Sequence, residues 1–334
     1  MTRGSLARRS AGHGRALPAL LFGGLALAGA ARGYETDQYS NRLMSLEDST
    51  EELDARVNET LERIAGEWEG PRDRLGFATA VYQELGGLHW VDRIERYAMK
   101  SDAIDKLPQH RGESIYAGAP IWARRVNWVF GVGRTISLAD SRIGSDKLGH
   151  FFSQGLKYYR SHLAGWSEAQ VARRGSFNER WLFGQLTTSV YSNADLVANW
   201  EGYRFYRSLF EDDVVPGKPR IVSFRGRGAR IVRPFTWRDH VNDYWDEAAN
   251  PSFWSPGLEK AMQEKLLELC PEYESSPESF LPRNEAELER RYAEIGLRPA
   301  LENRMDQICG KASPAEGDDA SGGSLAEPKP KGIQ

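Results

Sequence analysis

The sequence predicts a mainly α-helical fold, an irregular helical domain that carries one small β-hairpin. Apolar residues recur at helical spacing in several segments, whereas strand-like alternation is confined to one short stretch. The chain has 334 residues, of which 40% are hydrophobic and only two are cysteines. A chain of this length and composition can bury a core without relying on a disulfide or zinc framework.

Residues 1–33 read as a signal peptide. Four arginines precede the apolar run Ala16–Ala30, and small residues at 28–33 satisfy the small-x-small cleavage rule. No cysteine directly follows the apolar run, so no lipid anchor is expected. We therefore expect export to the periplasm or out of a bacterial cell.

The mature chain is acidic. Removing residues 1–33 takes away five arginines and no acidic residue, so the formal charge falls from −3 to −8. This balance disfavours nucleic acids and anionic lipid surfaces as general partners. No apolar stretch of about 18 residues follows the signal, so we expect no transmembrane span in the mature chain.

Cys270 and Cys309 are expected to form a disulfide, because an exported chain meets an oxidising compartment. The bridge would stabilise the fold by roughly 3 to 4 kcal/mol on the chain-entropy model. The alternative is a pair of buried free thiols that pack as small hydrophobes.

Helical periodicity predicts three helices in the N-terminal part of the mature chain. The first follows Ser49, with Glu52 completing a capping box. The second runs over residues 75–85 and ends at two glycines, and the third covers residues 91–100. Residues 108–143 are rich in glycine and predict irregular chain with short strands, including the apolar runs 121–122 and 126–132.

The remaining elements complete a single domain over residues 34–310. A β-hairpin is expected at 221–232, and residues 311–334 have the composition of a disordered tail. Further helices are expected at 146–163, 167–174, 177–210 (the longest, bent near Ser192), 237–249, 257–270, 285–295 and 299–308.

Two segments, residues 145–152 and 191–202, carry the residues best suited to chemistry. Asp146 and His150 lie four apart, as do Asp195 and Asn199, so each pair shares one helix face. If the two faces meet, these four side chains converge, and we expect Lys147 at the rim of the cluster. Small residues would permit the close helix approach that this requires: Gly149, Gly155, Gly202, Ala194 and Ala198.

The two segments resemble the motif pair of the VanZ-like proteins, which are small bacterial membrane proteins associated with glycopeptide tolerance and whose activity is not settled. Asp146, Lys147, His150 and Phe151 match D-K-x-x-H-F, and the second motif, D-x-x-A-N-x-x-G, is matched by Asp195, Ala198, Asn199 and Gly202. VanZ-like segments span membranes, whereas charged residues such as Lys157 and Arg160 lie on or beside the helices here. The whole chain also looks like an uncharacterised group of exported bacterial proteins.

Three interpretations of the cluster remain open. In the structural one, the polar groups form a hydrogen-bonded lock between two helices. In the catalytic one, His150 acts as general acid or base with Asp146 and Asp195, while Lys147, Ser192 and Asn199 contact the ligand. In the metal one, His150, Asp146 and Asp195 would supply one nitrogen and two oxygens, but the cluster has a single histidine, so no metal site is predicted.

A second stretch combines Trp237, Trp245 and Trp254 with acidic residues. Such residues stack against and hydrogen-bond sugars, but tryptophans also fill the cores of helical proteins, which is the interpretation we favour.

From these observations we expect an exported cell-envelope protein whose cluster binds a polar or anionic ligand, such as an envelope glycan or a lipid headgroup. A non-catalytic structural or interaction protein is the first alternative. A hydrolase with His150 as general base is the second. The sequence leaves open whether the protein is an enzyme, and it identifies no cofactor.

Overall fold

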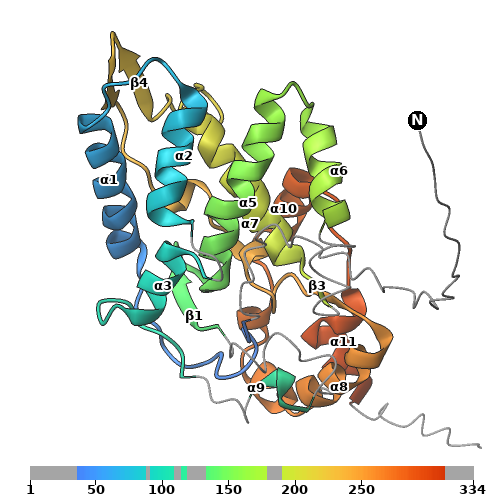
Figure 1. Cartoon of the computed structure of the whole chain (residues 1–334). Helices are drawn as coiled ribbons and strands as arrows, with labels where there is room; N and C mark the ends of the chain where they lie inside the picture. The colour runs from blue at the N-terminus through green and yellow to red at the C-terminus, as the bar shows by residue number, and fades with distance from the viewer. Residues whose placement is uncertain (1–35, 88–90, 109–113, 119–132, 179–189, 313–334) are drawn as a thin grey trace, which may run out of the picture.

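Two central helices, α5 (Asp146–Leu163) and α7 (Asn193–Ser208), pack side by side in the computed structural model (Figure 1). The structure describes residues 36–87, 91–108, 114–118, 133–178 and 190–312. A Cβ atom added to Gly155 would lie 2.5 Å from the carbonyl carbon of Gly202. The helices therefore approach as closely as glycine allows, as predicted for these two residues. Gly149 instead faces α3, where an added Cβ would meet Glu95.

Three helices cover one side of the central pair: α1 (Thr50–Gly66), α2 (Arg74–Leu85) and α3 (Arg93–Lys100) (Figure 1). Their positions confirm the periodicity of the sequence, and α2 ends at Gly86 as predicted. The predicted capping box of α1 is wrong, because the Ser49 side chain makes no capping hydrogen bond. Glu52 instead accepts a hydrogen bond from the Tyr97 hydroxyl, which ties α1 to α3.

A short hairpin leads directly into α5. Strands β1 (Thr135–Leu138) and β2 (Ser141–Gly144) pair antiparallel, and Ala139 and Asp140 form the turn with φ of 51° and 63°. A Cβ atom on Gly144 would lie 2.2 Å from Asp146 Oδ1, so the end of β2 must be a glycine to leave room for that carboxylate. The 121–122 and 126–132 runs lie outside the described residues.

The predicted long helix over residues 177–210 is wrong. Helix α6 (Glu168–Asn178) covers only the first two residues of that range, and β3 (Val190–Tyr191) is extended and pairs with β6 (Phe253–Trp254). The Ser192 hydroxyl then accepts a hydrogen bond from the Asp195 amide at 3.1 Å and starts α7. Because Ser192 caps the start of α7, the helix begins there, although the apolar spacing alone suggests one continuous helix through this segment.

The predicted helix over residues 237–249 is also wrong. The segment contains two 3-10 turns, η3 (Trp237–Asp239) and η4 (Asp243–Trp245). The side chains of Thr236 and Asn242 each accept a hydrogen bond from a backbone amide two residues ahead. Such local bonds compete with a continuous helix, and the irregular chain that results carries Glu247 toward α5.

The C-terminal part contains the predicted hairpin and a group of short helices. Strands β4 (Val222–Arg225) and β5 (Gly228–Ile231) pair around Gly226, whose φ is 60°. Cys270 and Cys309 form the predicted disulfide, at the start of the helix α9 (Cys270–Ser275) and within the helix α11 (Met305–Ala312). Residues 311–312 belong to α11 rather than to the tail, and 313–334 lie outside the described residues. The remaining elements are η1 (Ile115–Gly118), α8 (Pro256–Leu267), α9 (Cys270–Ser275), η5 (Pro277–Phe280), α10 (Glu285–Tyr292), η6 (Leu301–Asn303) and α11 (Met305–Ala312).

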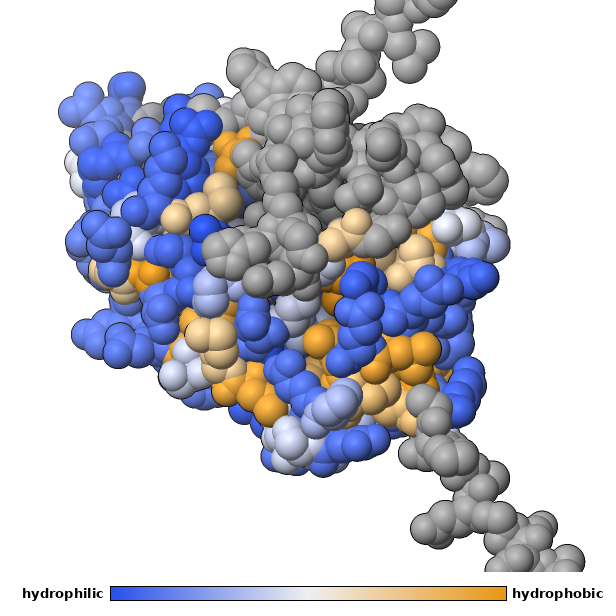
Figure 2. Space-filling model, turned by 90° about the horizontal axis from the view of Figure 1, so that it is seen from below, coloured by the Kyte–Doolittle hydropathy of each residue, from blue (hydrophilic) through white to orange (hydrophobic). Residues whose placement is uncertain are grey.

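Buried apolar residues form a larger cluster around α5 and α7 and a smaller one around α8 and α11. Trp237 and Trp245 belong to the larger cluster and Trp254 to the smaller, and all three are at most 1% exposed. These tryptophans are core residues, and none is free to stack against a sugar. On the face seen from below, hydrophobic residues gather in patches that hydrophilic residues border (Figure 2). Within the described ranges, no helix has the length and apolar character needed to cross a bilayer.

Candidate functional site

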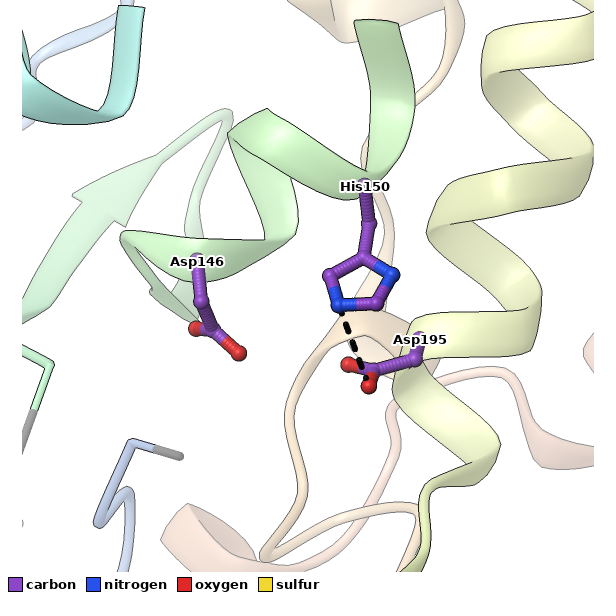
Figure 3. Close-up of side chains that lie close together, drawn as sticks. All are labelled: Asp146, His150 and Asp195. Atoms are coloured by element: carbon purple, nitrogen blue, oxygen red, sulfur yellow. Dashed lines mark ion pairs between the residues drawn. The ribbon is translucent and has the colours of Figure 1, made fainter. Parts of the chain in front are cut away.

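The polar faces of α5 and α7 meet, as the four-residue spacing predicts (Figure 3). His150 Nε2 lies 3.3 Å from Asp195 Oδ2, and His150 Nδ1 lies 3.1 Å from Asn199 Oδ1. Both ring nitrogens of His150, on α5, therefore contact side-chain oxygens of α7.

Lys147 lies at the centre of the cluster and not at its rim, so that prediction is wrong. Its Nζ atom is 2.7 Å from each of three carboxylate oxygens, which belong to Asp146, Asp195 and Glu247. The Lys147 side chain is 0% exposed. Three charge-assisted contacts draw the ammonium inward, because a buried cation requires partners of opposite charge.

Two hydroxyl groups support the carboxylates. Thr36 Oγ1 donates a hydrogen bond to Asp146 Oδ1 at 2.7 Å. Ser192 Oγ donates to Glu247 Oε1 at 3.2 Å and accepts from the Asp195 amide. Ser192 is 1% exposed, so in this arrangement it orders the site rather than meeting a ligand.

Glu247 and Thr36 are the members that the sequence analysis missed. Glu247 lies 100 residues from Lys147, and Thr36 lies 110 residues from Asp146. The available signal for Glu247 was its place directly after Trp245 and Asp246 in an aromatic stretch, where an acidic residue needs a partner if it is buried. Asp246 meets the same need separately, through Arg42 at 2.5 Å.

The pKa values of the carboxyl groups diverge. Burial raises the pKa of Glu247 to about 7, with Lys147 opposing the shift and the carboxylates of Asp195 and Asp146 adding to it. Burial also acts to raise the pKa of Asp195, but His150 and Lys147 outweigh it and the pKa is lowered. Asp195 is therefore ionised at neutral pH, whereas Glu247 gains or loses a proton near pH 7.

Exposure separates His150 from the rest of the cluster. Its side chain is 16% exposed, compared with 9% for Asp195, 3% for Asp146 and 2% for Glu247. Solvent therefore reaches the cluster chiefly at the imidazole.

Asp146, His150 and Asp195 also have the spacing of a cation site. One donor atom from each lies within 4.8 Å of the other two, and no other group of three such residues does so within the described residues. The donor set, one imidazole nitrogen and two carboxylate oxygens, is of the kind that binds divalent metals.

A second buried ionic cluster lies on another face of α7. Glu201 Oε1 contacts Arg291 at 2.7 Å and the Tyr292 hydroxyl at 2.9 Å, and Oε2 lies 3.2 Å from His240 Nδ1. Burial would raise the pKa of Glu201, but Arg291 and Arg204 outweigh it and the pKa falls to about 2. This cluster ties α7 to α10.

A cavity of about 250 Å³ lies beside α10, with the stacked rings of Tyr244 and Tyr292 in its wall. Asn193, the first residue of α7, also lines it, but His150 and Asp195 do not. The cavity is therefore separate from the cluster.

The chain matches no protein-family model, and it has no significant match among curated proteins or solved structures. Its function must therefore be argued from the geometry of this cluster.

Proposed function

We propose that the protein is exported and acts in the bacterial cell envelope. Lys147 and its three carboxyl partners, Asp146, Asp195 and Glu247, form what we call the Lys147 cluster. This cluster holds His150 in place to contact a neutral polar ligand such as the hydroxyl groups of a glycan. The signal-like residues 1–33 and the disulfide support the location. The observation that carries the proposal is the contrast in exposure between the enclosed charges and the accessible imidazole of His150.

The charge of the cluster favours a neutral ligand over an anion. Three carboxyl groups surround one ammonium, so the site is negative when they are ionised. Lys147 directs its charge at carboxylates, which removes the basic group that an anionic headgroup would need. Hydroxyl groups can donate to carboxylates, and an imidazole can donate to them or accept from them.

Acid–base catalysis by His150 is a second candidate, and a specific contact favours it. Asp195 lies 3.3 Å from Nε2, and a carboxylate at one ring nitrogen is how a histidine general base is oriented. Both nitrogens are engaged in this arrangement, so a substrate would have to displace Asp195 or Asn199 from one of them.

Two substitutions separate a ligand site from a helix lock. Lys147→Met leaves three carboxyl groups buried without their cation and should cost about 3 to 5 kcal/mol in urea unfolding. His150→Gln keeps a polar side chain at the accessible edge and should cost about 1 kcal/mol or less. Lys260→Met is the matched control, because that side chain is 85% exposed and should change stability little.

Binding to purified peptidoglycan fragments, measured by calorimetry, then tests the ligand. We expect His150→Gln to weaken this binding while the protein stays folded. Equal destabilisation by His150→Gln and Lys147→Met, with binding unchanged or absent throughout, would favour the lock alone. Mass spectrometry of the protein from its host tests export, and an intact Met1 would contradict it.

A further inference from the structure

We infer that Asp146, His150 and Asp195 bind one divalent cation of the Zn²⁺ or Mn²⁺ class. The inference rests on the proposed function, because it uses the same site. A ligand hydroxyl group or a water molecule would bind to the ion beside His150. The first support is the convergence of the three donor atoms within 4.8 Å. Donors that share a zinc ion at about 2.0 to 2.2 Å lie roughly 3 to 3.5 Å apart, so a modest contraction completes the site.

The orientation of His150 is the second support. Asn199 presents its oxygen to Nδ1 at 3.1 Å, so Nδ1 donates to the amide and Nε2 is the nitrogen that faces the carboxylates. Nε2 lies 3.3 Å from Asp195 Oδ2, so these two atoms are placed to share one positive charge between them, which a proton or a metal ion can supply. A metal-bound histidine usually donates its other ring N–H to an oxygen acceptor, and the Asn199 side-chain oxygen lies where it can accept that bond.

The charge balance is the third support. Asp146, Asp195 and Glu247 carry three negative charges when ionised, and Lys147 supplies one positive charge. With all three carboxyl groups ionised and His150 bound to the metal as a neutral imidazole, a divalent cation brings the sum to zero. Lys147 contacts Asp146 Oδ2 and Asp195 Oδ1, whereas Asp195 Oδ2 faces His150. The ammonium therefore holds the carboxylates in place and leaves an oxygen directed at the imidazole.

A binding experiment on this protein is not complicated by free cysteines. Both cysteines of the sequence are joined in the disulfide, so no thiolate competes for zinc. His162 lies on the same helix and contacts the Tyr203 hydroxyl at 3.1 Å and Glu211 at 3.8 Å. It provides a matched control for adventitious binding by a histidine near a carboxylate.

The test is calorimetric titration of the EDTA-stripped mature protein with ZnCl₂ and MnCl₂, with MgCl₂ as a hard-ion comparison. We expect one Zn²⁺ or Mn²⁺ per chain and at least about tenfold weaker binding in His150→Gln. His162→Gln should bind as the unchanged protein does. Asn199→Ala should weaken zinc binding about tenfold and raise the zinc concentration at which the imidazole ¹⁵N shifts of His150 respond, whereas a purely structural role would leave the zinc affinity unchanged.

Several results would overturn the inference. They are the absence of stoichiometric binding, equal losses in the two histidine variants, or ¹⁵N shifts of His150 in the unchanged protein that do not respond to zinc. The last measurement needs no variant and so does not depend on how well one folds. Peptidoglycan binding that persists in EDTA without metal binding would contradict this inference alone. Metal binding without peptidoglycan binding would contradict the proposed ligand alone.

Discussion

At the scale of single residues, helix α7 presents one buried acid to each of two ionic clusters. Asp195 faces Lys147 and His150 near the start of the helix, and Glu201 faces Arg291 and His240 farther along. Replacing a buried ion pair with apolar residues is often neutral or stabilising. These charges are therefore better explained by what they position than by net stability, and His150 is the accessible group they position.

Glu247 gives the cluster a predictable pH dependence. Because its pKa rises to about 7 in the fold, the native protein holds more protons than the unfolded chain between about pH 4.5 and 7. Stability contributed by this proton is present below about pH 4.5 and is lost as the pH rises through 7. Glu247→Gln keeps an oxygen for Lys147 and Ser192 but cannot titrate.

The stability of the unchanged protein relative to Glu247→Gln should therefore fall between about pH 4.5 and 7 and level off above. Urea unfolding across this range in EDTA measures the difference, and the contributions of groups outside the cluster, such as His240, cancel. A difference that stays constant with pH, or that grows as the pH rises, would show that Glu247 does not hold a proton in the fold.

At the scale of elements, the crossing of α5 and α7 depends on glycine. A Cβ atom on Gly202 would lie 1.9 Å from the carbonyl oxygen of Phe151. Backbone cannot yield as a flexible side chain does, so Gly202→Ala should destabilise the protein by about 3 kcal/mol. Gly310→Ala in α11 is the control: its Cβ meets nothing within 4 Å, so it should be neutral or stabilise by up to about 1 kcal/mol. Thermal unfolding compares the two, and equal effects would mean that the helices can move apart without loss.

Elements with regular apolar spacing were predictable from the sequence, and those defined by side-chain capping were not. The spacing of Leu53, Val57 and Leu61 placed α1, and glycine placed the end of α2. The segments around Ser192 and Asn242 also have helical spacing, but there the side chains bond to nearby backbone amides and end or begin an element. Apolar periodicity does not register such bonds.

At the scale of the whole molecule, local sequence patterns predict only part of the candidate site. Pairs four residues apart placed Asp146, His150, Asp195 and Asn199 correctly, because a helix fixes which residues share a face. The position of Lys147 depends on Glu247, which reaches it only because the chain from η4 onward is irregular. Contacts between segments so distant in sequence follow from tertiary packing, which a local pattern does not encode.

The disulfide closes the smaller apolar cluster, so its loss should act locally. It joins Cys270 to Cys309 across 39 positions, and both belong to the cluster formed with α8 and α11. On the chain-entropy model the double variant Cys270→Ser, Cys309→Ser should lower the free energy of opening by roughly 4 kcal/mol. Hydrogen exchange should therefore quicken in α8 and α11 and stay slow in α5, whose apolar residues lie in the larger cluster.

Glu247 links the charged cluster around Lys147 to the smaller apolar cluster. Its side chain contacts Lys147, and its backbone oxygen accepts a hydrogen bond from the Tyr39 hydroxyl of the smaller apolar cluster at 2.8 Å. In the double variant, the hydrogen-exchange rates of amides near Glu247 should thus increase less than those in α8 and α11 but more than those in α5. Uniform acceleration through α5, α8 and α11 would mean instead that both clusters open as one cooperative unit. In that case the disulfide would stabilise the Lys147 cluster as strongly as it stabilises the helices that it joins.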